Sequence, residues 1–181
     1  MGSIWPGACW GALGCALALG LQPSVMAKTK QTVVYSFCSQ QNCTDGANPE
    51  TSLIDVKGAL FGTTNAGGDN IYGSVFALNP KSGAEKIVHA FGSGADGKNP
   101  KALLEVKGTL YGTTYSGGAY GYGTVFAINL STGSETVLYS FCKLQLCADG
   151  ENPGPSLIDV KGTLYGITTL GRQWIWHNLR N

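Results

Sequence analysis

Charge of either sign is scarce in this chain. Only 13% of the 181 residues are charged, about half the usual share, and 12 lysines and arginines balance 11 aspartates and glutamates. The net charge of +1 excludes the basic surface that nucleic-acid binding needs, and we find no acidic tail or membrane-surface helix. Apolar residues make up 43% of the chain, which excludes a disordered protein and is enough for a core.

Long hydrophobic runs are also absent. The longest, residues 10–21, has about a dozen residues, whereas a membrane-spanning helix needs about 20. Small side chains at Val25 and Ala27 follow the run, as a signal peptidase requires. We therefore predict that residues 1–27 are a cleavable signal peptide, that no transmembrane segment is present, and that the protein is secreted or held at the cell surface. The alternatives are an uncleaved tether or a mis-assigned start codon, because no basic residue precedes the run.

Two of the six cysteines, Cys9 and Cys15, leave with the signal peptide. The other four form two C-x4-C pairs in matching contexts: Cys38 with Cys43, and Cys142 with Cys147. A zinc site more often shows C-x-x-C spacing with a histidine nearby. We predict two local disulfides, which suit an exported protein, and keep zinc as the alternative.

A sequence repeat occupies the rest of the chain. Asp55-Val-Lys-Gly-Ala-Leu-Phe-Gly-Thr-Thr64 returns, slightly altered, at residues 105–114 and 159–168. The unit is about 50 residues long, and the first and third copies carry the cysteine loop where the second has a shorter turn. The predicted units are 33–87, 88–137 and a partial unit, 138–171, within a repeat region of residues 28–171.

Each unit has the pattern of short strands separated by turns. In the first unit the expected strands are residues 33–37, 52–57, 59–64 and 74–79, and Asp-Gly-x-Asn-Pro marks a turn in every unit. No helical period appears past residue 30. We predict an all-β fold, an incomplete β-propeller-like array of four-stranded antiparallel blades. A β-sandwich is the alternative, but it does not explain the period.

One stretch resembles a known family. Leu110-Tyr-Gly-Thr-Thr-Tyr-Ser-Gly-Gly118, followed by Gly121-Tyr-Gly-Thr-Val-Phe126, is similar to the GloVer tandem repeat of secreted bacterial proteins. The resemblance covers about residues 33–171. It implies an exported array of many repeats, often joined to a surface-anchoring region, and it brings no catalytic residue with it.

The third unit departs from the pattern at residues 172–181. The codons of Trp174 and Trp176, read one nucleotide forward, both give glycine, and the shifted frame restores a glycine-rich repeat ending. We expect this tail to be out of frame and the chain to be a truncated fragment of a longer propeller protein. The alternative is a genuine tryptophan-rich cap. A chain with fewer than three full units is expected to be marginally stable as a monomer and to self-associate through an open sheet edge.

Motifs with chemical meaning are weak. One aspartate and one asparagine recur in each turn, which indicates turn chemistry, with calcium as the alternative and no other cofactor expected: Asp45, Asp96, Asp149, Asn48, Asn99 and Asn152. His89 stands where the other units have Tyr35 and Tyr139, so we expect no catalytic histidine and no catalysis. Three tyrosines near the glycine-rich bends are candidate ligand contacts, with aromatic packing as the alternative: Tyr72, Tyr120 and Tyr122.

The leading hypothesis is an exported, non-catalytic repeat module that binds a surface protein or a polysaccharide. A fragment of a secreted propeller enzyme acting on glycans is the second hypothesis, and it would require carboxylates or histidines specific to one unit. A non-functional gene remnant is the third.

Overall fold

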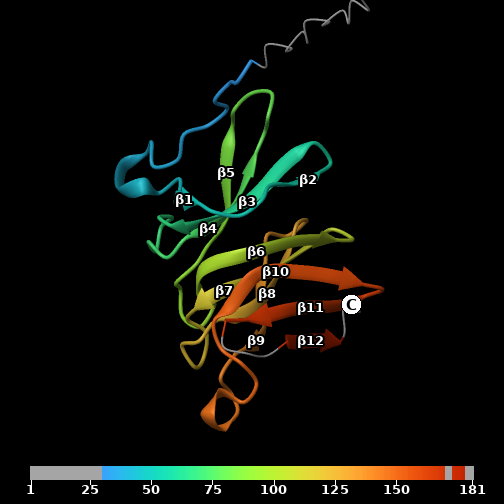
Figure 1. Ribbon diagram of the computed structural model, residues 1–181. Coiled ribbons are helices and arrows are strands. Elements are labelled where there is room, and N and C mark those ends of the chain that lie inside the picture. The colour runs from blue at the N-terminus through green and yellow to red at the C-terminus, as the bar shows by residue number, and fades with distance from the viewer. Residues whose placement is uncertain (1–29, 170–172, 178–181) are drawn as a thin grey trace, which may run out of the picture. The chain divides into compact units, whose positions relative to one another are not determined.

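The computed structural model describes residues 30–169 and 173–177 (Figure 1). The predicted signal peptide, Cys9 and Cys15 lie outside the described residues, as do positions 172 and 178–181 of the expected tail. The described part contains strands and two short 3-10 turns, η1 (Gln41–Cys43) and η2 (Gln145–Cys147), but no α-helix. Within it, therefore, no helix has the length and apolarity needed to cross a membrane.

The strands form three antiparallel sheets, which follow one another along the chain. The first sheet contains β1 (Ala47–Pro49), β2 (Ile54–Val56), β3 (Ala59–Ala66), β4 (Ser74–Leu78) and β5 (Glu85–Ala90). The second contains β6 (Lys98–Val106), β7 (Thr109–Ser116), β8 (Thr124–Asn129) and β9 (Glu135–Ser140). The third contains β10 (Pro153–Val160), β11 (Thr163–Thr168) and β12 (Gln173–His177).

The sheets repeat one plan. β1 and β2 both pair with β3, in the way that the single strand β6 pairs with β7. The hairpin between β2 and β3 turns at Lys57 and Gly58, which both have positive φ, as a two-residue type I′ turn requires. Gly58 N–H donates to Asp55 Oδ1 at 2.8 Å, and the same bond recurs at the equivalent turns of the other two sheets. The recurring acid before the Lys-Gly pair therefore closes a turn.

The all-β prediction is confirmed, and the sheets are antiparallel and open. Closure into a propeller stays a prediction. The boundaries of the sheets differ from those of the predicted units. We expected the strand with the Tyr/His-x-Phe motif to be the first strand of a unit, but β5 and β9 are the last strands of the first and second sheets.

The prediction of a strand at residues 33–37 is wrong. Its equivalents, β5 and β9, pair with β4 and β8 of their own sheets. Residues 33–37 have no such neighbouring strand within the described part of the chain, so the segment is unpaired.

β12 takes the place in the third sheet that β4 and β8 take in the others. Gly166 lies opposite Trp174 in the register of β11 and β12, as Gly62 lies opposite Phe76 and Gly112 opposite Phe126. The reading frame that encodes this segment stays a prediction.

Aromatic side chains connect one sheet to the next. Phe91, which directly follows β5, lies 4.9 Å from Phe126 of β8 between ring centroids. Both are buried in a core cluster with Phe61, Val75 and Leu110, so this cluster spans the first two sheets. Phe37 contacts Phe76 of β4 in the same way, at 4.6 Å. The Tyr/His-x-Phe motif therefore supplies an aromatic ring to the following sheet.

Glycine in the Leu-aromatic-Gly-Thr motif makes room for the ring on the next strand. A Cβ at Gly62 would lie 2.6 Å from Phe76 Cζ, and a Cβ at Gly112 would lie 2.6 Å from the Ala102 carbonyl oxygen and against the Phe126 ring. Neither glycine has positive φ, so close approach, and not backbone conformation, requires it.

We predict that Gly112→Ala lowers the free energy of unfolding by about 1–3 kcal/mol, the usual cost of overpacking a core. Gly154→Ala is the matched control, because the atoms nearest its Cβ would be the Ile167 side chain, at 3.2 Å, and the Ile167 carbonyl oxygen, at an ordinary contact distance of 3.6 Å. Urea unfolding of both variants measures the difference. Equal stability of the two variants would contradict this account of the motif.

Candidate functional site at the junctions between sheets

The aspartate of the Asp-Gly-x-Asn-Pro turn is the centre of each junction. Asp45 is buried and accepts hydrogen bonds from Tyr35 Oη at 2.9 Å, from Ser39 N and Oγ at 2.9 and 2.8 Å, and from Gln40 N at 3.3 Å. One carboxylate thus ties the preceding aromatic residue and the backbone of the cysteine loop to the start of the sheet.

The other two units repeat this arrangement. Asp149 accepts from Tyr139 Oη at 2.6 Å and from the backbone N–H groups of Lys143 and Leu144. Asp96 accepts from Gly92 N at 3.0 Å and lies 3.2 Å from His89 Nε2. His89 therefore has the structural place of the two tyrosines, as predicted from the repeat.

These contacts change the acidity of the groups involved. Burial by itself raises the pKa of Asp45, but the bonds from Ser39, Tyr35 and Gln40 outweigh burial and lower it to about 2. The pKa of Asp149 is lowered for the same reasons. Burial, and then Asp149 and Tyr120, raise the pKa of Tyr139 to about 12. Burial lowers the pKa of His89 although Asp96 opposes that shift.

The asparagine of the motif joins successive sheets. Asn99 Nδ2 donates to the Asn65 carbonyl at 2.9 Å, and Asn99 N–H donates to the Tyr72 carbonyl at 2.8 Å. Asn152 makes the corresponding bonds to the carbonyls of Tyr115 and Tyr122. All three asparagines of the motif have φ between 51° and 57°, a left-handed conformation that asparagine tolerates better than most residues.

Proline completes the contact. A Cβ at Gly73 would lie 2.8 Å from Pro100 Cδ, and one at Gly123 would lie 2.5 Å from Pro153 Cδ. Each proline ring thus packs against a glycine of the preceding sheet's bend. The turn motif is explained residue by residue as a sheet-to-sheet connector, in agreement with the turn chemistry expected for it. The calcium alternative stays untested, although the carboxylate of Asp45 already accepts four protein donors.

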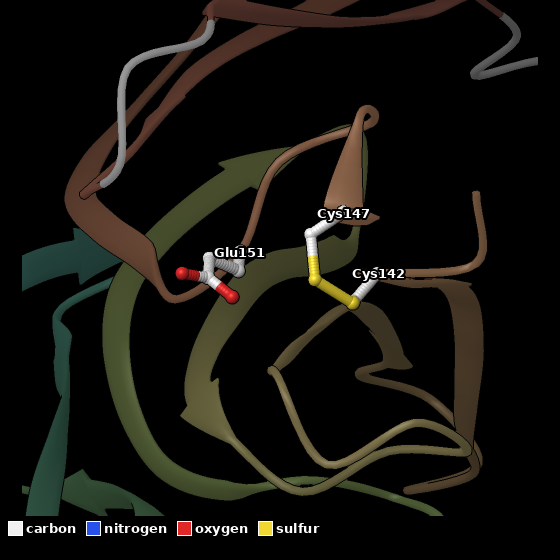
Figure 2. A group of neighbouring side chains, drawn as sticks. All are labelled: Cys142, Cys147 and Glu151. Carbon is white, nitrogen blue, oxygen red and sulfur yellow. A yellow bond between two sulfur atoms is a disulfide. The ribbon is translucent and has the colours of Figure 1, made fainter. Parts of the chain in front are cut away.

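The two cysteine pairs are bonded as Cys38–Cys43 and Cys142–Cys147, which fits the predicted pairing. Cys142, Cys147 and Glu151 form a group whose sulfur and carboxylate atoms lie within 4.8 Å of one another. Figure 2 shows the disulfide with the Glu151 side chain beside it. Because the sulfurs are bonded to each other, they offer no thiolate to zinc.

A second carboxylate accompanies the aspartate in the first two units. Burial and the negative charge of Asp96 raise the pKa of Glu135 to about 7, and burial and Asp45 raise that of Glu85. One oxygen of each glutamate, Oε1, is buried and has no hydrogen-bond partner among the residues that the structure describes. Such unequal carboxylates can serve acid–base chemistry, but the pair recurs in two units, whereas a catalytic site is expected to differ between units.

The three candidate tyrosines do not share one environment. Tyr72 is covered, because Lys98 Nζ lies 3.9 Å from its ring centroid and Gly92 leaves space for the ring. At the next junction the equivalents of Lys98 and Gly92 are Glu151 and Cys142. Glutamate provides no cation–π contact and the cysteine Cβ fills the space, so the tyrosine equivalent to Tyr72 cannot pack in the same way.

That tyrosine, Tyr122, is exposed, and so are Tyr120 and Tyr115, with exposed fractions of 41–46%. In the first unit the residues equivalent to Tyr115 and Tyr120 are Asn65 and Asn70. The sequence prediction identified Tyr120 and Tyr122 as candidates but missed Tyr115.

The cysteine loop of the third unit, which we call the third loop, adds two apolar side chains to this junction. Leu146 is 95% exposed and has φ 58°, a conformation disfavoured for leucine, and Leu144 is exposed as well. The equivalent residues of the first loop are Asn42 and Gln40. Strain and exposure together at an apolar residue suggest a role outside folding. A residue-by-residue comparison of the two loop sequences would have identified Leu144 and Leu146 as candidate contact residues, although not the strain at Leu146.

The first junction is where the first sheet meets the second, and the second junction is where the second sheet meets the third. We call the set Tyr115, Tyr120, Tyr122, Leu144 and Leu146 the second junction surface. The bend that carries Tyr120 lies near the start of the loop that carries the leucines, because Ala119 N–H donates to Ser140 Oγ at 3.3 Å and the loop begins two residues later. The first junction has one comparable side chain, Ile71, which is 65% exposed at φ 65°.

We predict that Asn99→Ala lowers the free energy of unfolding by about 1 kcal/mol more than Asn48→Ala does, the usual contribution of one hydrogen bond. Asn48 has the same backbone conformation, with φ 55°, but is exposed and makes no side-chain hydrogen bond in the described part of the chain. The control therefore separates the backbone cost from the side-chain bonds of Asn99, which are the bond between sheets to Asn65 and a bond accepted from Ser116 Oγ at 3.0 Å. Thermal or urea unfolding measures both variants, and equal losses would contradict the connector role.

We predict that Asp45 stabilises the fold in a pH-dependent manner. Its pKa is lower in the folded state than the unfolded value of about 3.9, so its contribution is complete above that value and is lost as pH falls toward about 2. Asp45→Asn should therefore cost about 1–3 kcal/mol at neutral pH, and the difference from the parent chain should shrink over this acidic range. Asp69→Asn, at an exposed carboxylate, is the control. A difference that does not change with pH would contradict the prediction.

Comparison with known proteins places the chain in a family. The model of the Gloeobacter/Verrucomicrobia repeat matches residues 21–175. No curated protein matches the chain. Among solved structures, the computationally designed Ika4 protein is similar, with 11% sequence identity, 82% of this chain and 99% of that chain covered, and a TM-score of 0.38. The family match covers most of the chain and agrees with the glycine and aromatic spacing, so this protein belongs to the Gloeobacter/Verrucomicrobia repeat family.

Proposed function

We propose that the protein is an exported, non-catalytic repeat module that binds an extracellular partner, a polysaccharide or a surface protein, through the second junction surface. The observation that carries the proposal is Leu146, an apolar residue almost fully exposed in a disfavoured backbone conformation. A side chain that contributes little to the fold and costs conformational energy is well suited to contact a partner.

The loop that presents Leu146 is held rigidly. A disulfide closes it, and Asp149 accepts two of its backbone N–H groups. Rigid presentation lowers the conformational entropy that binding costs. Exposed tyrosines beside the loop supply large surfaces that can stack on sugar rings or fill a protein pocket.

Two further features support an extracellular location. The disulfides are of the kind that persists in oxidising compartments, and the sequence of residues 1–27 has the pattern of a signal peptide.

We favour binding over the alternative of a glycan-acting enzyme because the groups that could do acid–base work, the paired carboxylates, recur in two units. Within the second junction surface, the residues that differ from their equivalents in the first unit are instead aromatic and aliphatic. Residues that break a repeat are those expected to carry its specific function.

We predict that Leu144→Gln with Leu146→Asn, which gives the third loop the residues of the first, weakens partner binding at least tenfold. The fold should keep its stability, because asparagine tolerates the left-handed conformation that strains leucine. Gln40→Leu with Asn42→Leu, the reciprocal change in the first loop, is the matched control and should leave binding unchanged. Binding is measured on a glycan array and by titration with cell-envelope polysaccharide.

Binding with no release of reducing ends supports the proposal, and release of products would favour the enzyme instead. If the Leu144 and Leu146 changes leave binding intact, the second junction surface is not the contact site.

A further inference from the structure

Residues 33–36 are equivalent to residues 87–90, the last four of the six residues of β5. Val34-Tyr-Ser-Phe37 aligns with Val88-His-Ala-Phe91, so Val33 corresponds to Ile87 and Tyr35 to His89. The contacts toward the following sheet are also equivalent: Tyr35 donates to Asp45, and Phe37 stacks on Phe76. This segment therefore lies against the first sheet as the end of β5 lies against the second.

The strand pairing is missing, and one backbone contact differs. The Val34 carbonyl oxygen lies 2.8 Å from where a Cβ on Gly83 would stand, whereas nothing lies within 4 Å of that position on the equivalent Gly133. β5 pairs with β4, and β9 with β8, whereas residues 33–36 pair with no strand among the described residues. Val33 is 75% exposed. A segment with adjacent β-branched residues, Val33 and Val34, and no strand partner is a template for pairing with another strand.

β12 offers the complementary edge. By register it is the equivalent of β4, yet in the described part of the chain it pairs with β11 alone. The third sheet thus has the first three strands of the repeat, and residues 33–36 have the sequence and inter-sheet contacts of the fourth.

We propose that residues 33–36 of one copy pair antiparallel with β12 of a second copy and complete its third sheet as the fourth strand. The internal template fixes the register. Val75 lies opposite His89 and Phe76 opposite Ile87 in the first sheet, so Tyr35 lies opposite Gln173 and Val33 opposite Trp174 in the assembly. Val34 occupies the irregular position that Val88 occupies between those pairs.

The pairing also continues the sheet-to-sheet connections. Because Tyr35 and Phe37 are already fixed on the first sheet of their own copy, that sheet would follow the third sheet of the neighbour as the second follows the first. The contact is heterologous: each copy has one donor segment and one acceptor edge. Such contacts produce closed rings or open filaments. This inference is independent of the proposed partner-binding surface.

The first test measures self-association of the purified chain by sedimentation velocity over a range of concentrations. We expect concentration-dependent oligomers, and we expect Val33→Pro to weaken association at least tenfold, because proline removes an N–H and disfavours pairing within a sheet. Val33→Thr retains strand propensity and is the control. Circular dichroism checks that each variant is folded.

The second test fixes the register. A Val33→Cys chain and a Trp174→Cys chain are mixed under thiol–disulfide exchange, and a disulfide-linked heterodimer is expected, since directly opposed residues have Cβ atoms close enough for the bond. Val33→Cys mixed with Ile175→Cys is the control, because adjacent strand residues point to opposite faces.

A monomer at all concentrations would overturn the proposal. So would oligomers that Val33→Pro leaves unchanged, or cross-linking that is equal for positions 174 and 175.

Discussion

The aspartate at the start of each sheet, buried in the first two units and half-buried in the third, makes the interaction on which the rest of the structure depends. In the first unit it gathers a tyrosine hydroxyl, a serine and two backbone N–H groups within hydrogen-bonding distance. An ionised group at a buried position is stable only when such donors compensate for lost hydration. The donors come from the segment before the turn, so satisfying the carboxylate also fixes one sheet against the next.

Once the aspartate, asparagine and proline of the turn have fixed the junction, the loops around it can change. The first and third units close the loop with a disulfide, whereas the second uses a shorter turn and an imidazole in place of a phenol. All three keep the carboxylate contact. A scaffold of this kind allows exposed residues, such as the tyrosines and leucines of the second junction surface, to vary without loss of the fold.

The connecting segments also explain why residues 33–37 are unpaired among the described residues. Each connecting segment has two roles, as the fourth strand of one sheet and as the aromatic contact for the next. At residues 33–37 the second role is fulfilled and the first is not. Among the described residues, such a segment can therefore keep its contact with the following sheet without being paired as a strand.

The sequence by itself determined the repeat, the all-β class, the family and the residues of the connecting turn, because a recurring motif states which positions the fold constrains. It also placed His89 with Tyr35 and Tyr139. Only the tertiary structure decided where each sheet begins, because a period has no intrinsic phase and pairing depends on which strand is adjacent. It alone showed that Lys98 covers Tyr72 while Tyr122 is exposed, since exposure depends on side chains from the next sheet. The strain at Leu146 was likewise visible only there, because backbone conformation is set by the closed loop and not by the residue's own preference.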